Sequence, residues 1–141
     1  MKKTAAVLLS ACALSLGTTV AASGVGNTFT STLTPTSIHT GQTFKITSTH
    51  AKPSTTYYCV EIVIKGTGYG YSPSSLKSVK SSSAGHVTCT NTYKAFKATV
   101  NGVARHCPQT AADKRAHVMC GIALSTADKS STTSGFFTSV S

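Results

Sequence analysis

The residues with the clearest chemical potential lie in a basic loop that two cysteines bracket. Cys107 and Cys120 are thirteen positions apart, and a disulfide across that interval would stabilise the fold by about 3 kcal/mol, because the unfolded chain loses conformational freedom. The enclosed segment carries Lys114, Arg115 and His117. Cations held on a fixed loop favour the docking of an anion, although a solvated loop on a basic protein gives the same pattern. We predict that these three residues contribute to a ligand-binding site.

The composition indicates one β-rich domain with a strong positive charge. A chain of 141 residues suffices for one domain. With 40% hydrophobic and 11% charged residues, and Ser and Thr supplying the remaining polarity, it is typical of extracellular β proteins. Thirteen Lys and Arg against three acidic residues give a formal net charge of +10. This balance predicts affinity for small anions and for anionic cell surfaces.

Residues 1–23 are predicted to be a secretory signal peptide. Two lysines precede an apolar run, residues 5–16, that is too short to span a bilayer, and small residues follow it. We expect a secreted, extracellular mature domain over residues 24–141, beginning near Gly24, with eleven basic and three acidic residues and a net charge of +8. A lipoprotein signal ending at Cys12 is the alternative, but it would leave only seven apolar residues before the cut.

The mature chain keeps four cysteines, an even number typical of two disulfides in an exported domain. Four cysteines allow three connectivities, and their order along the chain favours Cys59 with Cys89 and Cys107 with Cys120. No Cys-x-x-Cys or His-x-x-x-His spacing occurs, so a metal site is disfavoured.

Short segments of alternating apolar and polar residues, separated by turn signals, predict an all-β fold. Asn101-Gly102 is typical of a tight hairpin turn. We predict an immunoglobulin-like antiparallel β-sandwich of seven to eight strands. The main predicted strands lie at residues 29–33, 43–47, 57–64, 76–79, 86–89, 95–100, 118–124 and 135–140.

Residues 57–64 form the most strand-like segment, which we expect at the centre of a sheet. Even-numbered residues occupy one face and odd-numbered residues the other. Because Glu61 shares the odd-numbered face with Cys59, we predict that this face is an open side of the sheet and not the main core. Glu61, Val63 and Lys65 would then contact a ligand.

Residues 66–73 alternate Gly with Tyr and predict a flexible loop that displays Tyr69 and Tyr71 for stacking against a ligand. A plain glycine-rich connection is the alternative. The segment lacks the lysine and the strand-to-helix context of a phosphate-binding loop.

Several segments, in the same order, resemble the neocarzinostatin family of secreted actinobacterial proteins. They are a Thr-Pro-Thr-Ser turn at residues 34–37, Gly-Gln-Thr-Phe-Lys-Ile at 41–46, the strand with Cys59, the disulfide-flanked hairpin, and 120–128 before a terminal aromatic strand. The resemblance implies an immunoglobulin-like sandwich, two disulfides, and a cleft between the larger sheet and a hairpin that holds an enediyne chromophore. That family is acidic and its second cysteine interval is shorter, so the fold is expected to carry over without the ligand.

The positive charge fits a second resemblance better, to the small secreted antioxidant proteins of the type called radical oxygenase of propionibacteria. This resemblance implies an immunoglobulin-like fold, a positively charged groove and haem binding. We therefore expect a hydrophobic anionic small molecule, with haem as the leading cofactor, and an antioxidant, radical-scavenging role. The basic loop with Arg105 would contact the ligand, and His106 or His117 would be the axial ligand. An antimicrobial protein or a chromophore carrier of neocarzinostatin type is the alternative.

Hydrolysis is disfavoured because the three carboxylates lie on different segments and no Gly-x-Ser-x-Gly elbow occurs. No catalytic residue is predicted, and any activity would be redox chemistry at most. Lysine and tyrosine together suit single-stranded nucleic acid, but export argues against a dedicated role of that kind. We expect a monomer.

Overall fold

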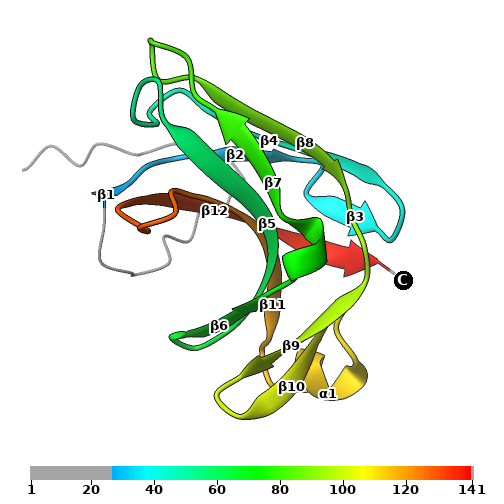
Figure 1. Cartoon of the computed structure of the whole chain (residues 1–141). Helices are drawn as coiled ribbons and strands as arrows, with labels where there is room; N and C mark the ends of the chain where they lie inside the picture. Colours follow the sequence, from blue (N-terminus) through cyan, green and yellow to red (C-terminus); the bar gives the residue numbers. More distant parts are fainter. Residues whose placement is uncertain (1–26, 141) are drawn as a thin grey trace, which may run out of the picture.

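The computed structural model describes residues 27–140 as two packed β-sheets with a hairpin at one end (Figure 1). The predicted signal peptide, the alternative lipoprotein cysteine and the predicted start at Gly24 lie outside the described residues. No helix within the described part of the chain is long and apolar enough to cross a membrane. The elements are β1 (Asn27–Thr28), β2 (Thr32–Thr34), β3 (Ser37–His39), β4 (Thr43–Ser48), β5 (Thr56–Lys65), β6 (Gly68–Tyr71), the 3₁₀ turn η1 (Pro73–Ser75), β7 (Lys77–Lys80), β8 (Val87–Thr92), β9 (Phe96–Val100), β10 (Val103–Cys107), α1 (Ala111–Arg115), β11 (Met119–Ser125) and β12 (Ser131–Val140).

The large sheet is built around β5, β11 and β12. Its strand order is β1-β12-β11-β5-β6, with β7 paired to the first half of β5 and β3 paired to the end of β12. β11 pairs antiparallel with β5 on one side and with β12 on the other. β1 and β3 run parallel to β12. The predicted sandwich is confirmed, and the strands outnumber the seven or eight expected because several pairings involve only two to four residues.

The small sheet has the strand order β2-β4-β8 and packs its apolar side against the large sheet. Phe44 and Ile46 on β4 and Val87 on β8 are 1%, 0% and 2% exposed, and the residues between them point outward. Burying each such side chain stabilises the fold by about 1.5–3 kcal/mol. From the large sheet, the core receives Tyr57, Ile122 and Leu124, along with other buried side chains.

Two disulfides fasten the layers, and both predicted pairings are confirmed. Cys59 on β5 joins Cys89 on β8, with Cα atoms 6.4 Å apart, and so links the two sheets. Cys107 on β10 joins Cys120 on β11, with Cα atoms 5.8 Å apart, and fastens the hairpin to the large sheet.

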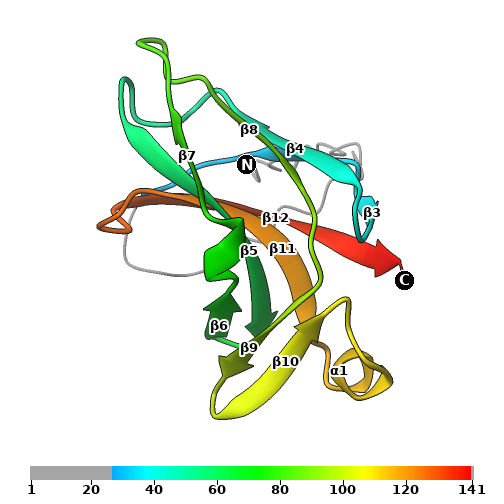
Figure 2. The same ribbon diagram turned by 45° about the vertical axis from the view of Figure 1, so that its right-hand side comes forward.

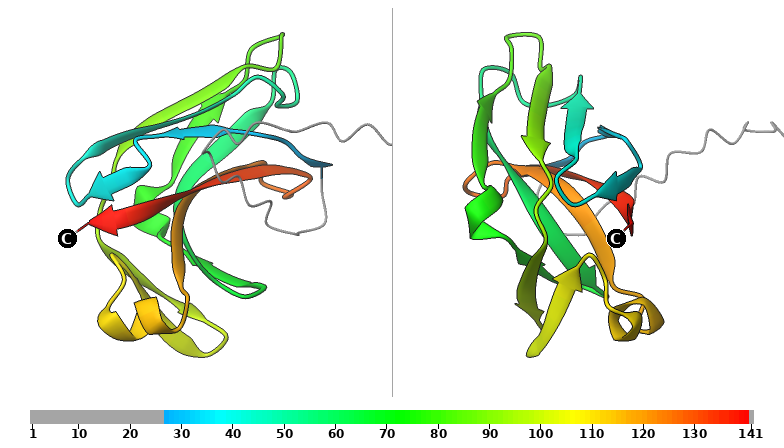
Figure 3. Two further views of the ribbon diagram at one scale, coloured as in Figure 1. Left: turned by 180° about the vertical axis from the view of Figure 1, so that it is seen from behind. Right: turned by 90° about the vertical axis from the view of Figure 1, so that its right-hand side faces the viewer.

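β9 and β10 form the hairpin, which lies with α1 at the end of the molecule opposite the turn between β7 and β8 (Figures 2 and 3). Asn101 and Gly102 have φ angles of 52° and 77°. A type I′ turn requires positive φ at both central residues, and Asn-Gly meets that need at low cost. The predicted tight turn is therefore confirmed.

The prediction of a flexible loop over residues 66–73 is wrong. Gly68–Tyr71 pairs with the end of β5 as strand β6, and Pro73–Ser75 forms η1. The alternation of Gly with Tyr has the period of a strand, with one face bare and the other aromatic. The helix α1 was not predicted either, because five residues are too few to show a helical period.

Candidate functional site

The side of the large sheet that faces away from the small sheet carries a second hydrophobic cluster, which we call the outer face. Ile62, Ile64 and Ala123 are 5%, 7% and 8% exposed at its centre, with Val60 and Phe136 packed against them. The cluster is separate from the main core. An apolar surface on this side of the sheet can serve as the floor of a binding site.

Two tyrosines of β6 stand beside this cluster. In the antiparallel register Tyr69 lies opposite Ile64 and Tyr71 opposite Ile62, which places both rings on the outer face. They are 51% and 50% exposed. The Lys129 Nζ atom donates a hydrogen bond of 2.6 Å to the Tyr69 hydroxyl and lies 5.4 Å from the ring centroid. That hydrogen bond raises the pKa of Lys129, so a firmly protonated ammonium borders the aromatic pair.

Met119, the first residue of β11, also lies on the outer face. It is opposite Ile64 of β5 and is 36% exposed. Next to it in the sheet, Gly121 lies opposite Ile62 and Phe136. A Cβ atom on Gly121 would come within 2.9 Å of the Phe136 ring, so this glycine lets the ring lie close over the backbone.

The space between the large sheet and the hairpin is filled by protein. A Cβ on Gly70 would lie 2.6 Å from the Ala98 Cβ, and one on Gly68 would lie 2.5 Å from the Asn101 side chain. Val63 and Val100, on the facing surfaces, are 0% and 2% exposed. The two glycines of β6 therefore let the hairpin pack directly on the sheet, where the family resemblance implies a cleft.

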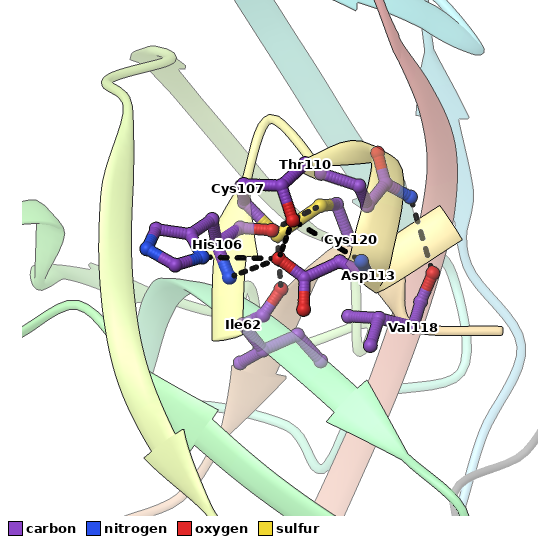
Figure 4. Close-up of a disulfide and its surroundings, with 8 residues drawn as sticks. Ile62, His106, Cys107, Thr110, Asp113, Val118 and Cys120 are labelled. Atoms are coloured by element: carbon purple, nitrogen blue, oxygen red, sulfur yellow. Dashed lines mark hydrogen bonds and ion pairs between the residues drawn. A yellow bond between two sulfur atoms is a disulfide. The ribbon is translucent and has the colours of Figure 1, made fainter. Parts of the chain in front are cut away.

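The end of β10 and helix α1 are joined through the carboxylate of Asp113, which is 3% exposed (Figure 4). Its Oδ2 atom accepts hydrogen bonds from Thr110 Oγ1 at 2.8 Å and from His106 Nδ1 at 3.0 Å, and Arg105 forms an ion pair with Oδ1 at 3.3 Å. Burial by itself would raise the pKa of Asp113, but the hydrogen bonds from Thr110, His106 and Arg105 outweigh it and lower the pKa to about 2. Arg105 and His106 thus hold the hairpin to the helix.

The other cations of the basic loop are exposed. Lys114 and Arg115 lie on α1, and His117 follows it with a φ of 55°. Within residues 27–140 their side chains form no hydrogen bond or ion pair. The structure keeps these three residues together, as predicted, but on a different part of the molecule from Tyr69 and Tyr71. Their role in ligand binding stays a prediction.

The prediction that Glu61 and Val63 lie on an open side of the sheet is wrong. Both side chains are 0% exposed and point between the layers. Lys65 lies opposite Gly68 and shares their orientation, toward the hairpin. The alternation along β5 was predicted correctly, but the odd-numbered face, which was predicted to be open, is the buried one. The disulfide through Cys59 crosses the core, so its neighbours Glu61 and Val63 are core residues as well.

Burial leaves polar atoms without partners around Glu61. Its Oε1 atom accepts a hydrogen bond of 2.9 Å from the Lys94 backbone N–H, whereas Oε2 and the Tyr93 hydroxyl have no hydrogen-bond partner among the described residues. Burial raises the pKa of Glu61. Burial, together with the smaller effect of the Glu61 charge, also raises the pKa of Tyr93 well above its ordinary value. Both side chains are 0% exposed.

Sequence reasoning missed Met119 and Phe136 as parts of the outer face, and Lys129 as the partner of Tyr69. Phe136 and Met119 belong to strands that were predicted, but their register against β5 was unknown. Lys129 reaches Tyr69 from a turn sixty residues away in the sequence. A period-two reading that placed the even-numbered residues of 57–64 outward would have found the cluster floor.

Comparison with known proteins places the fold. No family model matches the chain, and no curated protein matches it. Among solved structures, macromomycin, a neocarzinostatin-family chromoprotein, is similar with a TM-score of 0.62 and 19% sequence identity over 79% of this chain and 98% of that chain. The two chains therefore share a neocarzinostatin-like fold.

Proposed function

We propose that this protein is a small-molecule carrier that holds a flat aromatic ligand with anionic groups against the outer face. The observation that carries the proposal is the pair of tyrosines, Tyr69 and Tyr71, which are half exposed beside a buried apolar cluster. The fold likeness to a chromoprotein supports the same class of function.

The chemistry of the outer face suits such a ligand. Tyrosine rings stack on planar aromatic systems, with a gain of about 0.5–1.5 kcal/mol per pair beyond the area buried. Lys129, exposed and held beside Tyr69, can meet an anionic group of the ligand. An exposed ion pair contributes only about 0–1 kcal/mol, so burial of the ring must supply most of the affinity.

The outer face is a better site for this chain than the space between sheet and hairpin. The Ala98 and Val100 side chains occupy that space, and Gly70 makes contact with them. A ligand there would have to displace the hairpin, which the Cys107–Cys120 disulfide holds to β11.

Haem is the leading specific ligand, and two residues could hold its iron. Tyrosine ligates haem iron in some proteins. Tyr69 is half exposed, and the Lys129 ammonium, which donates a hydrogen bond to its hydroxyl, would compensate a phenolate. His106 is the alternative. Asp113 binds its Nδ1 atom, so Nε2 is the nitrogen that would bind iron, an arrangement common in metal-ligating histidines. Bound haem would supply the redox chemistry of the predicted antioxidant role.

An absorbance titration with haem and with metal-free protoporphyrin separates these possibilities. Tyr69→Ala and Tyr71→Ala should each weaken the binding of both compounds, whereas Val103→Ser, a change at an exposed apolar side chain of the hairpin, should not. Tyr69→Phe keeps the ring and removes the oxygen, so it should change the haem spectrum alone if Tyr69 ligates iron. His106→Ala should change it instead if His106 does.

Saturable binding of protoporphyrin that both tyrosine replacements weaken would support carriage on the outer face. Binding of neither compound, or binding that both alanine variants retain, would contradict it. Binding of haem alone, retained in Tyr69→Ala and lost in His106→Ala, would place the ligand at the hairpin and overturn the proposed site.

A further inference from the structure

The outward side of the small sheet carries a regular array of threonines with one lysine at its centre. Outward positions alternate with buried ones along β4 and β8, and the exposed members come from all three strands of the sheet. We call this surface the threonine–lysine face. It consists of Thr32, Thr34, Thr43, Lys45, Thr47, Thr88, Thr90 and Thr92.

The strand register orders these side chains in rows. Thr34, Lys45 and Thr90 lie side by side across the three strands. A neighbouring row holds Thr32, Thr47 and Thr88 in the same way. Adjacent strands are about 4.7–4.9 Å apart, and residues two apart along a strand are separated by about 6.6–6.8 Å. The face therefore offers hydroxyl groups at repeated short intervals in two directions.

Positive charge on this face has no local compensation. The Lys45 side chain is exposed and has no hydrogen bond or ion pair among the described residues. Lys77, on the neighbouring strand β7, donates a hydrogen bond of 2.7 Å to the Thr90 carbonyl and so brings a second ammonium to the edge of the face.

The acidic residues lie elsewhere. Glu61 and Asp113 are buried, and Asp128 is bonded to Thr126 and Ser130 in the turn before β12. Every ion pair among the described residues involves Asp113. The ammonium groups of the threonine–lysine face are thus available to an external anion, and charge complementarity selects a polyanion.

We propose that the threonine–lysine face binds an extended anionic polysaccharide. Threonine hydroxyls both donate and accept hydrogen bonds, as sugar hydroxyls do, and Lys45 with Lys77 would meet the acidic substituents of the polymer. Single-stranded nucleic acid would favour exposed aromatic rings for stacking, and a membrane surface would favour large apolar side chains. The exposed large hydrophobic residues of the described chain are Tyr69, Tyr71, Leu76, Val103 and Met119, none of which belongs to this face.

This inference goes beyond the proposed carrier function and does not depend on it. The threonine–lysine face is the outward side of the small sheet, and the outer face is the outward side of the large sheet. The core separates the two surfaces (Figure 3). A polymer of the cell envelope could therefore hold the protein at one side while the other side stays free for a ligand.

The test uses immobilised dextran sulfate, neutral dextran of the same length, and a single-stranded oligothymidylate, with the mature protein as analyte. Lys45→Gln removes one ammonium from the centre of the face, and Lys97→Gln makes the same charge change at an exposed position on β9 of the hairpin. Thr90→Val keeps the β-branched shape and the charge but removes one hydroxyl. Circular dichroism before and after heating shows whether each variant folds like the wild type.

We expect dextran sulfate to bind and neutral dextran to bind at least tenfold more weakly. Lys45→Gln should weaken binding about fivefold and lower its dependence on salt, as loss of a contact to a polyanion does, and Thr90→Val about threefold with the salt dependence unchanged. Lys97→Gln should change binding less than twofold.

Equal losses in Lys45→Gln and Lys97→Gln would show attraction by net charge alone and overturn the site. Oligothymidylate binding as tight as dextran sulfate binding, and equally sensitive to Lys45→Gln, would assign the face to nucleic acid and overturn the ligand class. Porphyrin titration of the same variants separates the two proposals, because Lys45→Gln and Thr90→Val should leave porphyrin binding unchanged.

Discussion

Replacing Glu61 by glutamine should stabilise this protein at neutral pH, because the wild-type carboxylate is buried with one oxygen unpartnered. The side chain is 0% exposed, and only Oε1 has a hydrogen-bond partner within the described chain, the Lys94 N–H. Glutamine keeps a carbonyl oxygen for that N–H and removes the charge.

The magnitude follows from the cost of an unsatisfied buried polar group, about 1–3 kcal/mol and more for a charged one. Glu61→Gln should raise the free energy of unfolding at pH 7 by about 1–3 kcal/mol. Because burial raises the pKa of Glu61 in the folded state, the folded protein binds this proton more readily than the unfolded chain does. The wild type should therefore gain relative stability as the pH falls through that raised pKa. Near the unfolded value of 4.5 the difference between the two proteins should shrink.

Urea unfolding at pH 7 and pH 4 measures both effects. Tyr93→Phe is the matched control, since it removes another unpartnered buried polar group without changing charge, and it should alter stability less than Glu61→Gln. A loss of more than about 1 kcal/mol at pH 7 in Glu61→Gln, or a gain of the same size at both pH values, would refute the reasoning.

Three further changes test the hairpin and its anchor. Asp113→Asn should lower the free energy of unfolding by about 2 kcal/mol at pH 7, because the pKa of Asp113 is lowered from 3.8 to about 2 in the folded protein. This contribution is complete above pH 4 and is lost as the pH falls toward 2. Thermal unfolding at pH 7 and 2.5 should show the variant converging with the wild type, and a constant difference would contradict the assignment. Gly70→Ala should lower the free energy of unfolding by about 1–3 kcal/mol, because the new methyl group overpacks against Ala98. Adding Ala98→Gly should restore part of that loss in urea unfolding. Equal losses in the single and double variants would argue against the contact. Replacing Cys107 and Cys120 together by serine should cost about 3 kcal/mol and make the hairpin the first site of limited proteolysis, whereas first cleavage at β4 or β8 would show that the disulfide does not hold the hairpin.

Much of the fold could be predicted because short local patterns in the sequence determine it. Period-two alternation marked β4 and β5, and Asn101-Gly102 marked the hairpin turn. Cysteine order sufficed for the disulfides because both pairs are sequential. The two short parallel pairings with β12 could not be predicted, since they join segments about a hundred residues apart.

The candidate site was predicted only in part. Tyr69 and Tyr71 were identified as displayed rings, and they are exposed, but on a strand and not on a loop. The wrong face of β5 was predicted to be open, because Glu61 was treated as a sign of an open surface although it is buried. Glu61 is buried against segments distant in the sequence: Ser75 of η1 bonds its backbone, and Lys94, between β8 and β9, bonds its carboxylate. No pattern within residues 57–64 reveals these contacts. Lys129 was out of reach for the same reason, since its contact with Tyr69 is tertiary.

The measurement that tests the carrier proposal most directly is a map of backbone amide chemical shifts during titration with protoporphyrin. We expect saturable changes centred on Tyr69, Tyr71, Ile64 and Phe136, with the residues of β4 and β8 unaffected. No saturable change, or changes confined to β9, β10 and α1, would contradict carriage on the outer face.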